Sequence, residues 1–596
     1  MSRKNDRPPA FFLVQTPGDE PAVPAPGRTT GRSEVASHSL LRFFSFGIDR
    51  SGTPLHNVSS IQRQRATEIR AGIRMLSRLR NFMNIKPEEF VFSGFQIVLL
   101  LLFLVIAGQS ITWPVVDDLA YLQYCGYLFA EHGLTPYKDF YDFQMPGTHL
   151  LFSALVWLVG VSALKWRLLD IALTSLLLTV TALWMRKKFN WQVALFGSQL
   201  VGFMYFSFGP NWSLQRDFIM LLPISLALVL LAAVKHKSLY RTCWCIGLLF
   251  GLSAAIKPQA AIGLPVVLFM AELEAREKDA YRKGSFLRLI YVSLSGFFGF
   301  LLPLALIFLW LYHTDAFYPF LDIWTKYLPC YNSLLGWDVC GSTYERIAFI
   351  AKNYVKFGGF AILIAPLTLS LYFTLFFSSA PRSQKRWSLF LTALAFVYSV
   401  NVAMAGKFFP YHWLPVFYFF VLVASLCIAA LSQEMARSAK TFPIMVLLIS
   451  SAILFRPSGF TLRPLIGHPV SIERDLVQMV RCLTTGGDTP HSVQVLAHNG
   501  TAHRAAILSK SISGSRFLTD TIFYVNEQSP TVQELRQRFL KEFLANKPEF
   551  ILEGGCQVRS KTTDGFPALQ RAIRENYSIV CEKDDFKVWR RSFCSR

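Results

Sequence analysis

The chain has 596 residues, of which 52% are hydrophobic and only 16% are charged, and its formal net charge is +22. Soluble proteins carry about 25% charged residues, so this chain has too little polar surface to cover a water-exposed globule. With a mean hydropathy of +0.35, the composition excludes a soluble enzyme, a disordered scaffold and a fibrous repeat protein. It predicts a polytopic membrane protein.

The N-terminal region is polar and basic. Residues 1–58 place several prolines among polar residues, which predicts a disordered tail. Residues 59–88 form a basic amphipathic segment that carries six arginines and Lys86 directly before the first apolar stretch. Such a segment is typical of the cytoplasmic flank of a membrane span, where it contacts anionic lipid headgroups. The positive charge therefore indicates membrane lipids as partners and no nucleic acid.

Apolar stretches of the length that crosses a bilayer, about 17 to 25 residues, follow one another between residues 89 and 456. They are 91–111, 147–163, 168–185, 192–208, 218–235, 241–272, 288–312, 352–378, 387–405, 411–431 and 441–456. The 241–272 stretch is interrupted at Lys257-Pro258. The sequence thus predicts an all-α membrane domain with about eleven transmembrane helices and with 112–146 as its first outer loop.

The Lys/Arg bias of the short loops orients these spans and places the N-terminus inside and 112–146 outside. Two arrangements fit the middle of the chain. If 147–163 crosses fully, the basic residues 186–188 lie outside, against the bias. If 147–163 dips without crossing and the chain crosses separately on each side of Lys257-Pro258, these residues return inside. The bias favours the second arrangement, and both place the C-terminus outside.

The composition becomes that of a soluble protein from 457 to 596. Strand-like segments at 492–498, 550–552, 578–581 and 586–589 alternate with helical spacing at 531–545 and 566–576. These segments predict a small C-terminal α/β domain outside the cytoplasm. Cys330 and Cys340 flank an outer loop, where they can form a disulfide.

The first outer loop concentrates the residues best suited to chemistry. Asp117 and Asp118 follow the first span closely, and two adjacent carboxylates raise the pKa of at least one of them. One of the pair can therefore take a proton from a hydroxyl nucleophile. The same acids can instead hold a divalent cation together with Asp139 or Asp142, although their spacing does not require one.

Other polar groups are predicted to converge on the same side of the membrane. Aromatic faces beside carboxylates suit a sugar ring, and cations at the ends of apolar helices suit a phosphate. A lysine that interrupts an apolar run needs an anionic partner, which a lipid-linked phosphate would supply. The residues predicted to bind substrate are Tyr121, Tyr137, Asp139, Asp142, Arg216, Asp217, Lys257, Lys407, Tyr411 and His412.

The residues 116–121 (VDDLAY) and 133–146 (GLTPYKDFYDFQMP) resemble the first-loop signature of the GT-C-fold glycosyltransferases. That family includes lipid A aminoarabinose transferases and protein O-mannosyltransferases. The loop from Lys407 to His412 and the C-terminal segments are similar to later elements of the family. Two departures stand out: the acidic pair is Asp-Asp where many members have Asp-Glu, and a Lys-Pro-Pro element is replaced by Gln144-Met145-Pro146, so that lysine's role has no counterpart here.

The resemblance implies an enzyme that moves a sugar from a polyprenyl-phosphate donor to an acceptor hydroxyl on a lipid, a glycan or a protein, with inversion. Asp117 would act as the general base, and Lys407, Arg216 or Lys257 would neutralise the departing lipid phosphate. The resemblance also implies a bacterial inner membrane, with the site facing the periplasm. Two alternatives remain from the residues themselves: a secondary transporter, and a non-catalytic component of envelope polysaccharide assembly or export.

Overall fold

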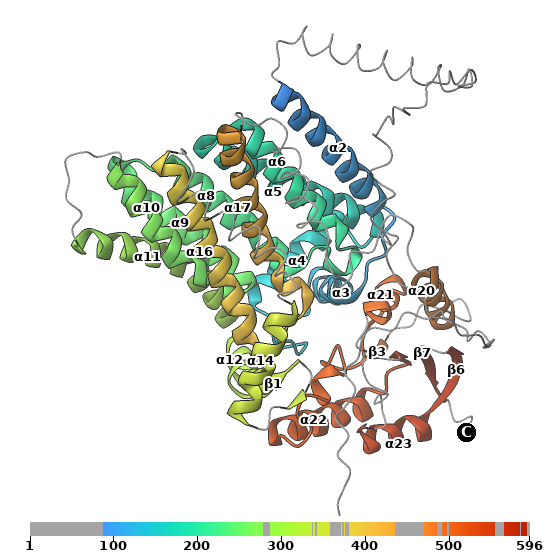
Figure 1. Ribbon diagram of the computed structural model, residues 1–596. Helices are drawn as coiled ribbons and strands as arrows, with labels where there is room; N and C mark the ends of the chain where they lie inside the picture. The colour runs from blue at the N-terminus through green and yellow to red at the C-terminus, as the bar shows by residue number, and fades with distance from the viewer. Residues whose placement is uncertain are drawn as a thin grey trace, which may run out of the picture. The chain divides into compact units, whose positions relative to one another are not determined.

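The computed structural model of the chain is dominated by α-helices, with one β-sheet near the C-terminus (Figure 1). It describes residues 87–277, 286–357 except 337, 340 and 341, residues 371 and 375, 381–435, 470–484, 492–497, 500–554, 565–583 and 586–592. The predicted N-terminal tail, 1–58, and nearly all of the basic segment 59–88 lie outside these residues.

Apolar helices fill the described chain up to residue 313. They are α2 (Pro87–Ser110), α3 (Asp117–His132), α4 (Pro146–Val159), α5 (Ala163–Lys188), α6 (Trp191–Ser207), α7 (Arg216–Ile219), α8 (Leu221–Ala233), α9 (Leu239–Ile256), α10 (Leu264–Glu277) and α11 (Phe286–His313). Two further long helices follow, α16 (Arg382–Ala405) and α17 (Leu414–Met435). Among the described residues, six helical stretches are long and apolar enough to cross a membrane, as expected of an integral membrane protein.

The predicted spans up to residue 312 correspond to described helices, with one division. The stretch 241–272 forms α9 and α10, separated at Lys257 by the short 3-10 helix η3 (Pro258–Gly263). Pro258 causes this break, because proline lacks a backbone N–H and disfavours a helical conformation at the residue before it. The predicted span 352–378 lies largely, and 441–456 entirely, outside the described residues.

Ion pairs join the ends of three of these helices. Glu274 of α10 accepts hydrogen bonds from Arg386 at 2.8 Å and from Trp387 at 2.9 Å, both on α16. The same carboxylate pairs with Lys188, the last residue of α5. The loops at these ends are the basic ones that loop charge predicts to be cytoplasmic.

Contacts at the other end of α5 distinguish the two predicted arrangements. Arg167, in the first turns of α5, donates a hydrogen bond of 3.0 Å to the carbonyl oxygen of Trp113, just beyond α2. Thr148, at the start of α4, donates one of 2.9 Å to the carbonyl oxygen of Ile256, the last residue of α9. Both α4 and α5 therefore begin at the end of the bundle opposite Lys188. These contacts fit the arrangement in which 147–163 dips without crossing.

The segment after α11 is built from short elements. They are α12 (Phe317–Asp322), the π-helical turn η4 (Ile323–Tyr327), α13 (Leu328–Ser333), the paired strands β1 (Leu334–Leu335) and β2 (Asp338–Val339), and α14 (Thr343–Phe357). The N–H of Gly336 donates a hydrogen bond of 2.9 Å to the carbonyl oxygen of Gly406. The segment around β1 and β2 therefore contacts the loop between α16 and α17.

The C-terminal part forms a mixed five-stranded sheet in the order β4-β3-β5-β7-β6. Its elements are α20 (Val470–Leu483), β3 (Ser492–Leu496), α21 (Gly500–Leu508), β4 (Ile512–Ser513), α22 (Pro530–Asn546), β5 (Phe550–Gly554), α23 (Pro567–Asn576), β6 (Tyr577–Lys583) and β7 (Phe586–Arg591). Strand β3 pairs in parallel with β4 and β5, while β7 is antiparallel to β5 and β6. The four strand-like segments and two helices predicted here are all present.

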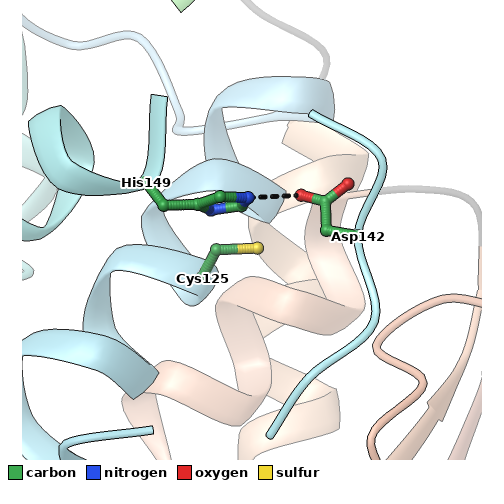
Figure 2. Close-up of side chains that lie close together, drawn as sticks. All are labelled: Cys125, Asp142 and His149. Carbon is green, nitrogen blue, oxygen red and sulfur yellow. Dashed lines mark ion pairs between the residues drawn. The ribbon is translucent and has the colours of Figure 1, made fainter. Parts of the chain in front are cut away.

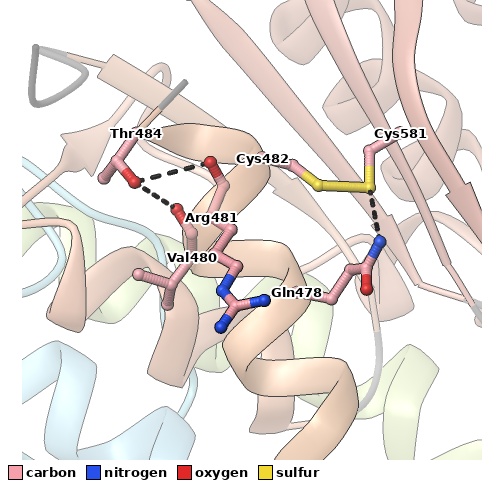
Figure 3. The surroundings of a disulfide bond; sticks show 6 residues. All are labelled: Gln478, Val480, Arg481, Cys482, Thr484 and Cys581. Atoms are coloured by element: carbon pink, nitrogen blue, oxygen red, sulfur yellow. Dashed lines mark hydrogen bonds between the residues drawn. A yellow bond between two sulfur atoms is a disulfide. The ribbon is translucent and has the colours of Figure 1, made fainter. Parts of the chain in front are cut away.

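A disulfide joins Cys482 of α20 to Cys581 of β6 (Figure 3). It attaches α20 to the edge strand of the sheet. The predicted pairing of Cys330 with Cys340 is wrong, because Cys330 is a free thiol whose Sγ lies 3.3 Å from Ser529 Oγ. Cys340 lies outside the described residues.

Candidate functional site

The predicted acidic pair opens α3. Asp117 has a φ of +48°, in the left-handed region that residues other than glycine rarely occupy, so its surroundings fix the backbone there. Part of Asp117 is exposed to solvent. The surrounding protein nevertheless desolvates its carboxyl group, and this effect, with a smaller one from the charge of Asp118, raises the pKa of Asp117 to about 6. Asp117 is therefore ionised at neutral pH and is a stronger base than an ordinary aspartate.

A fully buried network holds the segment that leads to this pair. Arg167 donates hydrogen bonds to the carbonyl oxygens of Trp113 and Pro114 and to Ser213 Oγ. Ser213 in turn donates one of 2.5 Å to Asp170 Oδ2. The network thus ties the backbone before Asp117 to the segment before α7. The sequence offered a signal that was overlooked: an Arg and an Asp three positions apart in an apolar helix are costly unless they are paired.

Asp217 and Lys257 form a buried ion pair between α7 and the junction of α9 with η3. Only 3% of Asp217 and 6% of Lys257 is exposed, so neither charge has water to compensate it. Lys257 therefore has the anionic partner that the sequence predicted it to need, and in this structure that partner is Asp217. The chain supplies that partner itself, and the pair connects two helices.

Arg216 contacts the first outer loop through a residue that the sequence did not single out. Its Nη1 donates a hydrogen bond to Gln144 Oε1. Gln144 is the first residue of the Gln144-Met145-Pro146 element. The Arg216 Nε is buried without a hydrogen-bond partner among the described residues. Arg216 thus retains one donor for a further acceptor.

Lys407 is buried, and its Nζ donates hydrogen bonds of 2.6 Å to the carbonyl oxygen of Tyr331 and of 3.0 Å to that of Leu334. The ammonium also lies 4.2 Å from the centroid of the Tyr331 ring, a cation–π contact. Burial, together with the charge of Arg346, lowers the pKa of Lys407 to about 7. Lys407 therefore holds the outer segment around α13, in addition to any role toward a substrate.

These groups come together although they are far apart in the chain. Asp118 is close enough to Lys257, Tyr331 and Tyr411 to interact with each of them electrostatically. The ring of Tyr411 meets His412 edge-on at 4.8 Å. His412 in turn lies within the influence of three cations, which are Lys257, Arg216 and Lys407. The acidic pair, the predicted cations and the 407–412 loop therefore form one site.

Asp142 belongs to a separate buried group. Its Oδ1 accepts hydrogen bonds from the N–H groups of Phe143 at 2.6 Å and Gln144 at 3.2 Å, while Oδ2 lies 3.3 Å from His149 Nε2 (Figure 2). Desolvation raises the pKa of Asp142 to about 7. The hydroxyl of Tyr121 interacts with this carboxyl, so these two predicted substrate-binding residues contact each other.

Tyr137 and Asp139 make local contacts in the first outer loop. Tyr137 is 1% exposed and donates a hydrogen bond of 2.6 Å to the carbonyl oxygen of Gln144. Its phenol therefore supports the loop in this structure. Asp139 is exposed, and its Oδ2 accepts a hydrogen bond of 2.7 Å from the N–H of Thr135.

Among the described residues, one group of His, Cys, Asp or Glu side chains lies close enough together to hold a metal ion: Cys125, Asp142 and His149. Their ligand atoms all lie within 4.8 Å of one another. In the part of the chain that the structure describes, Asp117 and Asp118 do not form such a metal-binding group with Asp139 or Asp142, the combination that the sequence suggested. The structure instead surrounds Asp142 with a thiol and an imidazole, neither of which the sequence reasoning singled out.

The chain is similar in structure to the ArnT protein of Cupriavidus metallidurans, solved bound to undecaprenyl phosphate. The two share 13% sequence identity with a TM-score of 0.51, over 83% of this chain and 98% of ArnT. An oligosaccharyltransferase from Archaeoglobus fulgidus, tethered to an acceptor peptide, is 12% identical with a TM-score of 0.43, over 84% of this chain and 74% of that one.

No protein-family model matches the sequence, and no curated protein matches it either. The likeness to ArnT covers almost all of that protein. It agrees with the resemblance carried by the first-loop residues. The chain therefore has the GT-C fold of the polyprenyl-phosphate-dependent glycosyltransferases.

Proposed function

We propose that the protein is a membrane glycosyltransferase that moves a sugar from a polyprenyl-phosphate donor to an acceptor hydroxyl, with inversion at the anomeric carbon. The ArnT structure with the same fold carries undecaprenyl phosphate, which supports a lipid-linked donor. The observation that carries the proposal is the partly exposed carboxylate of Asp117 beside Asp118. Asp118 interacts with Lys257, and Lys257, Arg216 and Lys407 all act on His412 in the same site.

The chemistry needs a base and a stabiliser of negative charge. Asp117 accepts the proton of the acceptor hydroxyl as its oxygen attacks the anomeric carbon. The bond between that carbon and the phosphate oxygen breaks, and the lipid phosphate leaves with the electron pair. Negative charge grows on this phosphate in the transition state, where fixed donors stabilise it most effectively.

Arg216 is the best placed of the three predicted cations for this role. Its buried Nε has no hydrogen-bond partner among the described residues, and a guanidinium presents several donors to a phosphate. Lys257 is already paired with Asp217, and Lys407 with two carbonyl oxygens. We therefore assign the phosphate contact to Arg216, with Lys257 and Lys407 shaping the field around it. Tyr411 and His412 complete the wall of the site.

The proposed site faces outward from a bacterial inner membrane, with about eleven crossings in total. Two features support this orientation. The basic helix ends at Lys188 and Arg386 lie opposite the acidic pair. The disulfide between Cys482 and Cys581 fits an oxidising compartment, which suits an extracytoplasmic domain over 457–596. The acceptor is a lipid, a glycan or a protein.

The test is transfer of a labelled sugar from polyprenyl phosphate by the full chain in lipid nanodiscs. Asp117→Asn should reduce turnover by about 10²- to 10⁴-fold, because the neutral amide cannot act as a base. Glu131→Gln is the matched control, since Glu131 is an exposed acid on the same helix. Undiminished transfer by Asp117→Asn would remove the assigned base. Solute uptake into vesicles without any glycosylated product would instead favour a transporter.

A further inference from the structure

The three side chains in Figure 2 come from three consecutive elements of the chain. Cys125 lies on α3, Asp142 in the loop after it, and His149 on α4. All three are buried, with 0%, 2% and 0% of their surfaces exposed. None of them is needed for the proposed transfer reaction, so the group requires an explanation of its own.

The polar atoms that face one another here lack the partners that buried groups normally have. Both ring nitrogens of His149 and the Oδ2 of Asp142 are buried without a hydrogen bond among the described residues. His149 Nε2 and Asp142 Oδ2 are 3.3 Å apart, but they do not meet in hydrogen-bonding geometry. Burying several such atoms without partners is energetically costly, which points to a missing common partner.

We propose that Cys125, Asp142 and His149 bind one zinc ion, which cross-links α3, the loop after it and α4. Nitrogen and oxygen ligands about 2.0 Å from a tetrahedral zinc ion lie about 3.3 Å from each other, which is the separation seen between His149 and Asp142. The Cys125 thiol belongs to the same group, within 4.8 Å. The site is independent of the proposed transferase activity.

The donor set selects the metal. Magnesium and calcium prefer oxygen ligands only, whereas a thiolate, an imidazole and a carboxylate together suit zinc. The Tyr121 hydroxyl interacts with both the Cys125 thiol and the Asp142 carboxyl. It therefore lies beside two of the three proposed ligands. Binding releases the proton of the Cys125 thiol, so the affinity for zinc rises with pH.

The surroundings already orient the ligands. Asp142 Oδ1 is held by two backbone N–H groups, which turns Oδ2 toward His149. The rings of Tyr137 and Phe140 pack edge-on against the imidazole, each with its centroid 5.5 Å away. Such outer contacts fix ligand geometry in metal sites. The N–H of Gln144 is one of the two donors to Asp142, and the Gln144 side chain accepts a hydrogen bond from Arg216. The proposed zinc ligands are therefore connected to Arg216 through Gln144.

The test is the zinc content of the full chain, purified in detergent without chelators and measured by plasma mass spectrometry. We expect about one zinc ion per chain and its loss from Cys125→Ser and His149→Gln. Cys243→Ser is the matched control, because Cys243 is also a buried free cysteine but lies on α9; this variant should keep its zinc. Equal zinc in the wild type and in both ligand variants would overturn the proposal.

Cobalt gives a second readout that does not depend on the ligand variants folding. Cobalt-loaded wild type and Cys243→Ser should both show a sulfur-to-metal charge-transfer band in the near ultraviolet. If wild-type protein dialysed against cobalt shows no charge-transfer band and also retains no zinc, that result would contradict a metal site at Cys125, Asp142 and His149. A catalytically active protein without any metal would refute the zinc site while leaving the proposed transferase function standing.

Discussion

Gly500, the first residue of α21, packs directly against the backbone of Asp117. A Cβ atom at position 500 would lie 2.4 Å from the Asp117 carbonyl oxygen and 2.6 Å from its amide nitrogen. Nearby, Arg504 Nη1 donates a hydrogen bond of 2.8 Å to Gln123 Oε1 on α3. The C-terminal part of the chain thus supports the helix that carries the proposed base.

Gly500→Ala should therefore reduce transfer, because the added methyl group must displace the backbone of Asp117. A misplacement of about 1 Å in a reacting group can cost about 10²-fold in rate. Steady-state turnover in nanodiscs measures the effect. Gly108→Ala on α2 is the control, since a Cβ there has no neighbour within 4 Å. Equal rates for the two variants would show that α21 does not position the base.

The rate of transfer should rise with pH through about 6. Burial raises the pKa of Asp117 to about 6, and the base acts only when it is deprotonated, so activity is low below that pH and levels off above it. The measurement is kcat/KM against pH for the wild type, with Glu131→Gln as the control that should keep the same profile. An ascending limb near 4, the range of an ordinary aspartate, would contradict the environment described for Asp117.

The Asp217–Lys257 pair should matter for stability as a pair. Lys257→Met leaves the buried Asp217 carboxylate without its partner and should cost about 3–5 kcal/mol. The double variant Asp217→Leu with Lys257→Met removes both charges and should recover most of that loss. Thermal unfolding in detergent measures both. Asp315→Asn, in the exposed pair with Lys138, is the control and should change the free energy of unfolding by less than about 1 kcal/mol.

If the double variant is as unstable as Lys257→Met alone, the pair does not act as a connection between α7 and α9. The same double variant also separates stability from catalysis. A double variant that is stable but inactive would show that the charged pair itself is needed at the site.

The Cys482–Cys581 bond should stabilise the C-terminal sheet. It closes a loop across 99 positions of sequence, and removing such a bond typically costs about 2–5 kcal/mol. Cys482→Ser should therefore lower the unfolding temperature of the C-terminal part in calorimetry. Cys330→Ser, which removes a free thiol, should leave it unchanged. Mass analysis showing two free thiols at 482 and 581 in protein from intact cells would contradict an outward-facing sheet.

The sequence predicted most of the fold because its signals are local. Long apolar stretches define the helices, and Pro258 marks the break after α9. Alternating polar and apolar residues define β3, whereas a short continuous apolar run, Phe550 to Leu552, defines β5. The two arrangements of 147–163 could be compared only through loop charge, because an apolar stretch of this length lies at the short limit for crossing a bilayer. The pairing of Cys482 with Cys581 could not be inferred, because nothing local brings α20 beside β6.

The site was predicted in part for the same reason. Asp117, Asp118 and the cations stood out as charges beside apolar helices, and the structure brings most of them together. Their individual partners depend on tertiary contacts. Lys257 pairs with Asp217, 40 positions away in the sequence. Asp142 lies beside His149 and Cys125, and the Tyr137 side chain is buried within the loop. The Arg167 network was overlooked because its members are distributed over three separate segments.

The most direct test of the account is the composition of envelope lipids and glycans in cells that lack this chain. Mass spectrometry should show that one sugar modification is missing and that its polyprenyl-phosphate-linked donor accumulates. Wild-type protein should restore the modification, whereas Asp117→Asn should insert normally and leave it missing. Full restoration by Asp117→Asn, or an unchanged set of lipids and glycans without the chain, would contradict a sugar transferase centred on Asp117.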